Sequence, residues 1–207
     1  MTNTLAILKA HPLVAILRGV RPVEVQDVAQ VLVGCGFRVI EVPLNSPQPL
    51  ESISKLAASI GPGTVVGAGT VLDTAQVEAG AQAGATLILS PNLNPAVVRH
   101  TVARGLVSMP GVATASEGFA ALDAGAHALK VFPADVLGVA TLKAWRAVFP
   151  QDVAFFGVGG IGPDNLQAFR KAGACGAGLG SSLYVPGIAL DELARRASGL
   201  VAAWEAR

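Results

Sequence analysis

The 207-residue chain has few charged and few aromatic residues, which make up 14% and 5% of it. Its formal net charge is +1, and its basic residues form no runs. It therefore lacks the basic face that nucleic acids and acidic membrane surfaces attract, which argues against both as partners. Such a sparsely charged surface also leaves apolar area that contact between subunits can cover.

Cysteine and histidine are equally scarce. Cys35 and Cys175 stand far apart, each flanked by glycine or alanine. They predict small buried side chains in a reducing compartment and no disulfide framework. The histidines, His11, His100 and His127, lack the spacing of metal ligands. We therefore expect no metal and no other cofactor.

Long apolar runs are also missing. The longest uncharged stretch, 79–98, contains prolines and asparagines and is typical of a helix end, a strand and a turn. The N-terminal segment 1–12 has an apolar run of only four residues, too short for a signal peptide. These features predict a cytoplasmic protein with no membrane partner.

What the chain does contain is a regular alternation of short apolar runs and helical patterns. The apolar runs recur at intervals of about 20 to 27 residues, and several are almost continuously apolar, as in parallel strands buried on both faces. The helical patterns open with typical start residues, with Thr74 as one expected N-cap. The expected strands are 13–17, 37–42, 64–69, 86–90, 106–109, 126–132, 153–158 and 176–179, and the expected helices are 22–32, 74–82, 94–103, 116–124, 141–148, 163–172 and 191–206.

This alternation fits a single (β/α)8 TIM barrel of the α/β class, with residues 1–207 as one domain. The alternative is an open, doubly wound sheet, which would carry a glycine-rich dinucleotide loop after its first strand. The segment 18–22 reads Arg-Gly-Val-Arg-Pro and lacks that loop. We therefore expect a barrel whose site lies where the strands end.

Lys130 lies within an expected strand, with no acid among the four residues on either side. Burial would lower the pKa of its ammonium group and favour the free amine, which can form a Schiff base with a carbonyl. A lysine that extends its amine to water at a strand end is the alternative. Alternation places Ala126, Ala128, Lys130 and Phe132 on the inward face and points His127 away from the barrel axis.

Glu41 stands between two β-branched residues, where an acid is costly to bury unless it is paired or functional. A raised pKa would suit a general acid and base. Alternatively, Glu41 is an ion-pair partner of Arg18 or Lys130. Arg18 follows the first expected strand, and its guanidinium suits a carboxylate or phosphate, although a surface salt bridge would also account for it.

Glycine-rich segments end the last two expected strands. In barrels of this class the loops at these positions often hold a phosphate on backbone N–H groups. Gly159, Gly160, Gly180 and Ser181 are small enough to allow that approach, although glycines also simply form turns. Thr70 brings a hydroxyl to the same end, unless it only packs the barrel.

An amine, an acid, an arginine and a phosphate cradle at one end indicate a phosphorylated keto-acid substrate. A protonated imine on the lysine would act as the electron sink, so this chemistry requires no metal. At these residues the sequence resembles the class I 2-keto-3-deoxy-6-phosphogluconate and 6-phosphogalactonate aldolases. The motifs are AILRG (15–19), EVPLNSPQ (41–48), GAGTVL (67–72), SPN (90–92), PGVATASE (110–117), ALKVFPA (128–134), VGGIGPDN (158–165) and GAGLGS (176–181).

Members of the phosphogluconate type usually follow the glutamate with a threonine and then an arginine. This chain has Pro43, Asn45 and Ser46 in that segment, which is similar to the phosphogalactonate type. The resemblance implies a homotrimeric lyase that cleaves 2-dehydro-3-deoxy-6-phosphogalactonate to pyruvate and glyceraldehyde 3-phosphate. The alternatives are a 2-dehydro-3-deoxy-6-phosphogluconate or 4-hydroxy-2-oxoglutarate aldolase, a phosphate-binding barrel isomerase or cyclase, and a non-catalytic sugar-phosphate binder.

The resemblance also implies roles for the residues singled out above. Lys130 would form the Schiff base, and Glu41 would shuttle protons, through a water molecule or directly. The substrate-binding residues would be Arg18 and Thr70 for the pyruvate carboxylate, Pro91 and Phe132 for the pocket walls, and Gly159, Gly160, Gly180 and Ser181 for the phosphate.

Overall fold

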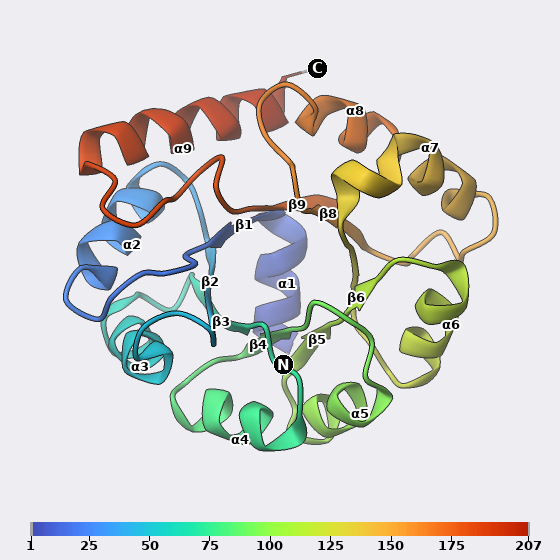
Figure 1. The fold of residues 1–207 in the computed structure, drawn as a ribbon, viewed down its shortest axis with the longest axis horizontal. Coiled ribbons are helices and arrows are strands. Elements are labelled where there is room, and N and C mark those ends of the chain that lie inside the picture. The colour runs from blue at the N-terminus through green and yellow to red at the C-terminus, as the bar shows by residue number, and fades with distance from the viewer. Residues whose placement is uncertain (1, 207) are drawn as a thin grey trace.

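The computed structural model describes residues 2–206, which form a ring of parallel strands inside a ring of helices (Figure 1). The strands pair in the order β5-β4-β3-β2-β1-β9-β8-β7-β6. Each neighbouring pair is parallel, which places all strand C-termini at one end of the ring. The strands are β1 (Leu13–Ile16), β2 (Val39–Pro43), β3 (Val65–Gly69), β4 (Leu87–Leu89), β5 (Val107–Met109), β6 (Gly111–Val112), β7 (Leu129–Val131), β8 (Phe155–Val158) and β9 (Gly176–Leu179).

β5 and β6 are two halves of one barrel strand, interrupted at Pro110, which has no N–H to give to the ladder. β5 pairs with β4, and β6 pairs with β7. Across the join, Lys130 N–H donates to the carbonyl of Pro110 at 2.9 Å, and His127 N–H donates to that of Ser108 at 3.0 Å. The ring is therefore closed, and the predicted (β/α)8 barrel is confirmed, with its fifth strand extended to Val112.

The outer helices within residues 2–206 are α2 (Val25–Gly34), α3 (Pro49–Ser59), α4 (Thr74–Gln82), α5 (Pro95–Ala103), α6 (Ala115–Asp123), α7 (Ala134–Arg146), α8 (Leu166–Lys171) and α9 (Leu190–Glu205). Asn94 caps α5, where its side chain accepts from Ala96 N–H at 3.1 Å. None of the helices described is long and apolar enough to cross a membrane.

Two helix predictions need correction, and one outer helix was not predicted. Asp73, and not Thr74, caps α4, because its carboxylate accepts from Gln76 N–H at 2.8 Å. α7 begins at Ala134 and continues across a kink at Gly138, so the predicted range 141–148 covered only its second part. The helix that was not predicted is α3.

A further helix that was not predicted, α1 (Thr2–Ala10), closes the N-terminal end of the barrel. Figure 1 shows it across the centre of the ring. Leu8 is 1% exposed and packs with inward-facing strand residues. Because these side chains fill the N-terminal end of the barrel interior, a site can lie at the opposite end, where the strands end. This inner cluster comprises Leu8, Val14, Val39, Val65, Leu87, Leu89, Val107, Met109, Ala128, Ala154 and Phe156.

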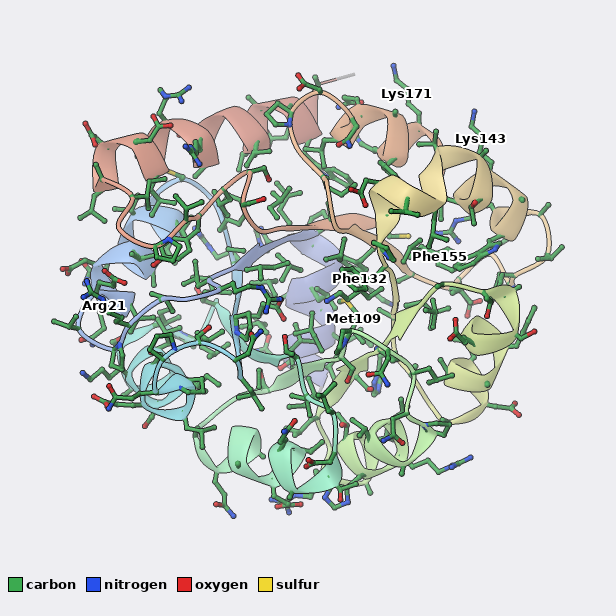
Figure 2. All side chains as sticks on the ribbon, viewed as in Figure 1. Arg21, Met109, Phe132, Lys143, Phe155 and Lys171 are labelled. Atoms are coloured by element: carbon green, nitrogen blue, oxygen red, sulfur yellow. The ribbon has the colours of Figure 1, made fainter. Side chains whose placement is uncertain are left out.

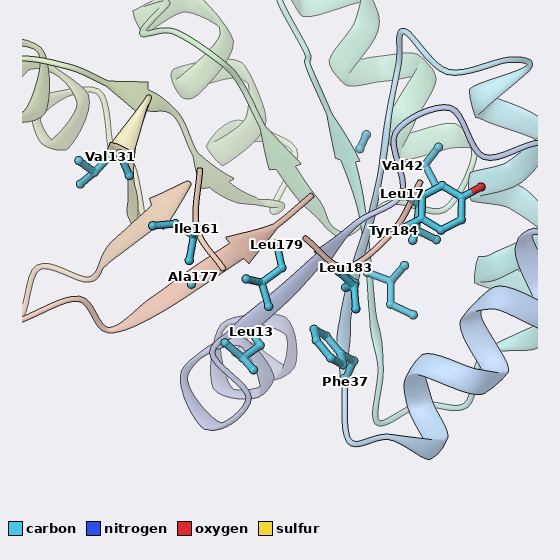
Figure 3. Close-up of a cluster of buried hydrophobic side chains, with 14 of the residues drawn as sticks. Leu13, Leu17, Phe37, Val42, Val131, Ile161, Ala177, Leu179, Leu183 and Tyr184 are labelled. Carbon is cyan, nitrogen blue, oxygen red and sulfur yellow. The ribbon is translucent and has the colours of Figure 1, made fainter. Parts of the chain in front are cut away.

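A larger apolar cluster fills the space between the strands and the outer helices (Figure 3). Val131 of β7 and Leu179 of β9 belong to it, together with Leu193 of α9. Full burial of such a side chain contributes about 1.5–3 kcal/mol. Burial on both faces explains why these strands appear in the sequence as almost continuous apolar runs.

The expectation of two buried cysteines is wrong. Cys175 is exposed and Cys35 is half-buried, and both are free. Cys175 directly precedes β9 at the rim of the barrel, where Arg146 Nη2 donates to its Sγ at 3.2 Å. Cys35 is the C-cap residue of α2. The small residues beside each cysteine allow the chain to turn at the end of a helix or the start of a strand, but they do not bury the thiol.

Candidate active site

A cavity of about 360 Å³ opens where the strands end. Figure 2 shows Phe132 close to the centre of the ring, well inside the outer helices. Every residue predicted for the site lines this cavity, with the single exception of Glu41. The predicted residues that line it are Arg18, Thr70, Pro91, Lys130, Phe132, Gly159, Gly160, Gly180 and Ser181. The loops that follow β1, β3, β4, β7, β8 and β9 thus contribute to one pocket.

Sequence reasoning missed other residues that line the cavity, among them Ile16, Val158, Ile161 and Gly178. Ile16 and Gly178 precede the predicted residues Arg18 and Gly180 by two positions. Strand alternation places such residues on the same inward face, so this signal was present in the sequence. Ile161 lies on the loop after β8 and carried no comparable signal.

Lys130 lies on β7, between Gly111 of β6 and Phe156 of β8, and is 5% exposed. Its Nζ lies 5.0 Å from the centre of the Phe132 ring. Burial lowers the pKa of this amine; the Arg18 cation lowers it further, and the Glu41 carboxylate opposes the shift. The side chain does not extend to water, which was the alternative, and the lowered pKa favours the free amine.

The residues just before Lys130 differ from the prediction. Ala126 lies outside β7, its N–H donates to the carbonyl of Ala121, and it packs against the outer cluster. It therefore does not share the inward face with Ala128, which belongs to the inner cluster. His127 Nδ1 accepts from Ser108 N–H at 3.1 Å, and burial lowers the pKa of this imidazole. His127 therefore contributes hydrogen bonds at the join between β5 and the segment before β7, where the barrel closes.

Glu41 lies on β2 beside Ile16 of β1 and Gly67 of β3, and is 2% exposed. Its Oε2 is buried and has no hydrogen-bond partner within residues 2–206. Burial raises the pKa of this carboxyl, while the cations of Lys130 and Arg18 partly offset the rise. A buried polar atom without a partner is uncommon and typical of functional sites.

The ion-pair alternative for Glu41 is not realised in the structure. The ion pairs among residues 2–206 do not include Glu41, Lys130 or Arg18. Arg18 is exposed, and its Nη1 instead donates to Oδ1 of Asn45 at 2.5 Å. The amine and the acid therefore share one electrostatic environment without neutralising each other by direct contact.

Thr70 follows β3 with a φ of 57°. This left-handed region is unfavourable for a β-branched residue and costs on the order of 1–3 kcal/mol. Such strain persists where the surrounding structure enforces it, and this occurs most often in functional sites. Here the strained residue lines the cavity.

The glycine-rich loops after β8 and β9 leave several backbone donors free. Gly159 and Gly160 have φ values of 95° and 64°. The N–H groups of Gly159, Gly160, Gly180 and Ser181 donate to no acceptor in the part of the chain that the structure describes. Consecutive N–H groups in such turns form concave sites for anions. Among residues 2–206, no group of three or more His, Cys, Asp or Glu side chains is arranged to hold a metal ion.

Comparison with known proteins agrees with this arrangement. The model of the KDPG and KHG aldolase family matches residues 5–195. This chain belongs to that family. The sequence is 47% identical to a probable 2-dehydro-3-deoxy-6-phosphogalactonate aldolase of Rhizobium meliloti, over 95% of this chain and 92% of the relative. It is 45% identical to the 2-dehydro-3-deoxy-6-phosphogalactonate aldolase of Escherichia coli, over 93% and 94%. The family resemblance inferred from the motifs is confirmed.

Solved structures of this aldolase family have the same fold. A native KDPGal structure superposes with a TM-score of 0.92 at 45% identity, over 93% of this chain and 94% of that one. KDPG aldolase from Legionella pneumophila, with pyruvate captured as a covalent carbinolamine intermediate, superposes with a TM-score of 0.83 at 28% identity, over 97% and 96%.

Proposed function

We propose that this protein is a class I aldolase that cleaves 2-dehydro-3-deoxy-6-phosphogalactonate to pyruvate and glyceraldehyde 3-phosphate. The observation that carries the proposal is the buried amine of Lys130 in the barrel mouth, in the same electrostatic environment as the buried, unpaired Glu41 carboxyl. The substrate assignment is supported by two relatives, 47% and 45% identical, that are named for the phosphogalactonate reaction.

The first step is attack of the Lys130 amine on C2 of the keto acid. Burial, which lowers the pKa of Lys130, supplies the unprotonated nucleophile. The carbinolamine loses water and becomes a protonated imine. The imine then accepts the electron pair of the C3–C4 bond as that bond breaks.

Cleavage requires a base for the proton of the C4 hydroxyl and an acid for C3. Glu41, whose pKa is raised by burial, can serve as this base and acid, directly or through a water molecule. As the C4 hydroxyl loses its proton, C3–C4 breaks, the aldehyde leaves and an enamine remains on Lys130. Protonation at C3 and hydrolysis of the resulting imine release pyruvate and regenerate the amine.

The remaining residues bind the two ends of the substrate. Arg18 and Thr70 hold the carboxylate, and the apolar faces of Pro91 and Phe132 line the pocket between the ends. The phosphate binds to the free N–H groups of the loops that follow β8 and β9, Gly159, Gly160, Gly180 and Ser181.

The proposal extends to a homotrimer that works in the cytoplasm. Large apolar side chains such as Val23, Phe119, Val136 and Val148 are exposed, and contact between subunits would cover such area. A chain from a porous protein cage, designed by fusing symmetric oligomeric domains, superposes with a TM-score of 0.92 at 45% identity, over 94% of this chain and 72% of that one. Light scattering tests the trimer, and a mass of 20.9 kDa would contradict it.

The closest competing substrate is 2-dehydro-3-deoxy-6-phosphogluconate, because a KHG/KDPG aldolase of Escherichia coli is 33% identical over 92% of this chain and 88% of the relative. Pyruvate release from both substrates, measured as kcat/KM, separates the two. We expect a preference of about tenfold or more for the phosphogalactonate substrate. The reverse preference would change the substrate and keep the reaction, whereas no pyruvate from either would overturn the aldolase proposal.

A further inference from the structure

The loop after β2 connects the site to a residue that has no assigned role. Asn45 lies four residues after Glu41 and is exposed. Its Oδ1 accepts from Nη1 of Arg18 at 2.5 Å, and Arg18 lines the cavity. A hydrogen bond from a charged group is stronger than a neutral one. Asn45 is therefore in a position to fix the direction of the guanidinium.

The same loop is itself held firmly. Leu44 N–H donates to the carbonyl of Gly69 at 2.8 Å, and Ser46 N–H donates to that of Pro43 at 2.9 Å. The buried Ser46 accepts from Gly19 N–H at 3.0 Å through its Oγ. These bonds tie the ends of β1, β2 and β3 together, so the Asn45 amide is presented from a fixed support.

The backbone of Arg18 is also fixed from its other side. Gly19 has a φ of 83°, and a Cβ added there would stand 2.8 Å from Cγ of Pro186, on the loop after β9. With the main chain held between Ser46 and Pro186, the freedom of Arg18 lies in its long side chain. Holding that side chain in one rotamer costs conformational entropy, and a fixed acceptor lowers the part of this cost that substrate binding must offset.

We propose that Asn45 is a positioning residue that holds the Arg18 guanidinium toward the cavity, so that it meets the anionic end of the substrate. Asn45 acts through Arg18 and does not itself take part in the reaction. This inference rests on the proposed aldolase function. It predicts that the effect of Asn45 appears in KM and requires Arg18.

A double-mutant cycle tests the proposal. Steady-state cleavage is measured for the wild type, Asn45→Ala, Arg18→Ala and the double variant. Asn45→Ala should raise KM about fivefold, the effect of losing an exposed hydrogen bond to a charged group, with kcat within about twofold. In the Arg18→Ala background the same change should leave KM within about 1.5-fold. Gln48→Ala is the matched control on this loop, because the Gln48 side chain is exposed and bonds Glu51.

Each other outcome overturns the proposal in a recognisable way. An unchanged KM in Asn45→Ala, or the same rise in both backgrounds, would show that Asn45 does not act through Arg18. A rise in KM for Gln48→Ala equal to that for Asn45→Ala would indicate a general effect of the loop. A wild type that releases no pyruvate would instead overturn the proposed function, and this inference with it.

Discussion

The backbone of Gly69 lies directly against the carboxylate of Glu41. A Cβ added to Gly69 would stand 2.5 Å from Oε2 of Glu41 and 2.9 Å from its Cδ. Gly69 ends β3, beside the strand that carries Glu41. The absence of a side chain at this position gives the buried carboxylate its space, and Gly69 therefore sets where the proposed base can lie.

Gly69→Ala should displace the Glu41 carboxylate and lower kcat by about tenfold or more, since small displacements of reacting groups are costly. Overpacking should also destabilise the fold by about 1–3 kcal/mol. Steady-state kinetics and denaturant unfolding measure the two effects. The matched control is Gly63→Ala, at a position where a Cβ would meet no atom within 4 Å. A normal kcat in Gly69→Ala would show that the carboxylate position is not critical.

Glu41→Gln should slow exchange of the C3 protons of pyruvate with solvent by about 100-fold or more, the usual contribution of a general base. The amide keeps the size of the carboxyl but cannot accept the proton. Exchange is followed by NMR in D2O. The control is Glu51→Gln, because Glu51 is an exposed acid in a surface ion pair with Lys55. Near-normal exchange in Glu41→Gln would assign the base to another group.

The pH dependence of imine formation should shift in opposite directions in two variants. The Glu41 carboxylate raises the pKa of Lys130 and the Arg18 cation lowers it. Glu41→Gln should therefore lower this pKa and extend reaction with pyruvate to lower pH, whereas Arg18→Ala should raise it and move the profile to higher pH. The profile is the rate at which the borohydride-trapped adduct forms at saturating pyruvate, measured as a function of pH. A shift in the same direction for both variants would contradict the described electrostatics.

Gly160→Ala should weaken binding of the phosphorylated substrate. Gly160 has a φ of 64°, and a Cβ there would collide with Cβ of Asp135. The loop must shift, so KM for the phosphorylated substrate should rise about tenfold or more, as when a well-placed contact to a charged group is lost. Trapping with pyruvate, which has no phosphate, should stay near normal.

Gly187→Ala is the control for this change, since Gly187 has a φ of 79° and open space around it. It carries the same backbone strain without the collision. Equal loss of pyruvate trapping and of substrate affinity in Gly160→Ala would show that these loops shape the whole pocket and do not bind only the phosphate.

Much of the barrel could be predicted because its strands are buried on both faces. A charged residue within such a strand is conspicuous, and this singled out Lys130 and Glu41, both of which the structure buries. Strand ends were predictable as well, because parallel strands bring their C-termini to one end. The same alternation also points to Ile16 and Gly178, which precede Arg18 and Gly180 by two positions and line the cavity.

The parts that were missed depend on tertiary contacts. The short helix α1 is stabilised by the packing of Leu8 beneath the barrel, and a helix of this length has little stability of its own. The bond between Arg18 and Asn45 joins two loops that are 27 residues apart. No periodic pattern encodes such loop geometry, so Asn45 was noted only as a departure from the phosphogluconate-type motif.

The most direct test of the central claim is borohydride reduction in the presence of pyruvate, followed by mass spectrometry of the peptides. The account predicts a stable adduct on Lys130, its loss together with all cleavage in Lys130→Ala, and its retention in Lys143→Ala. Lys143 is an exposed lysine that projects from the outer helix α7 (Figure 2). Cleavage that persists in Lys130→Ala, or an adduct on another lysine, would contradict the account.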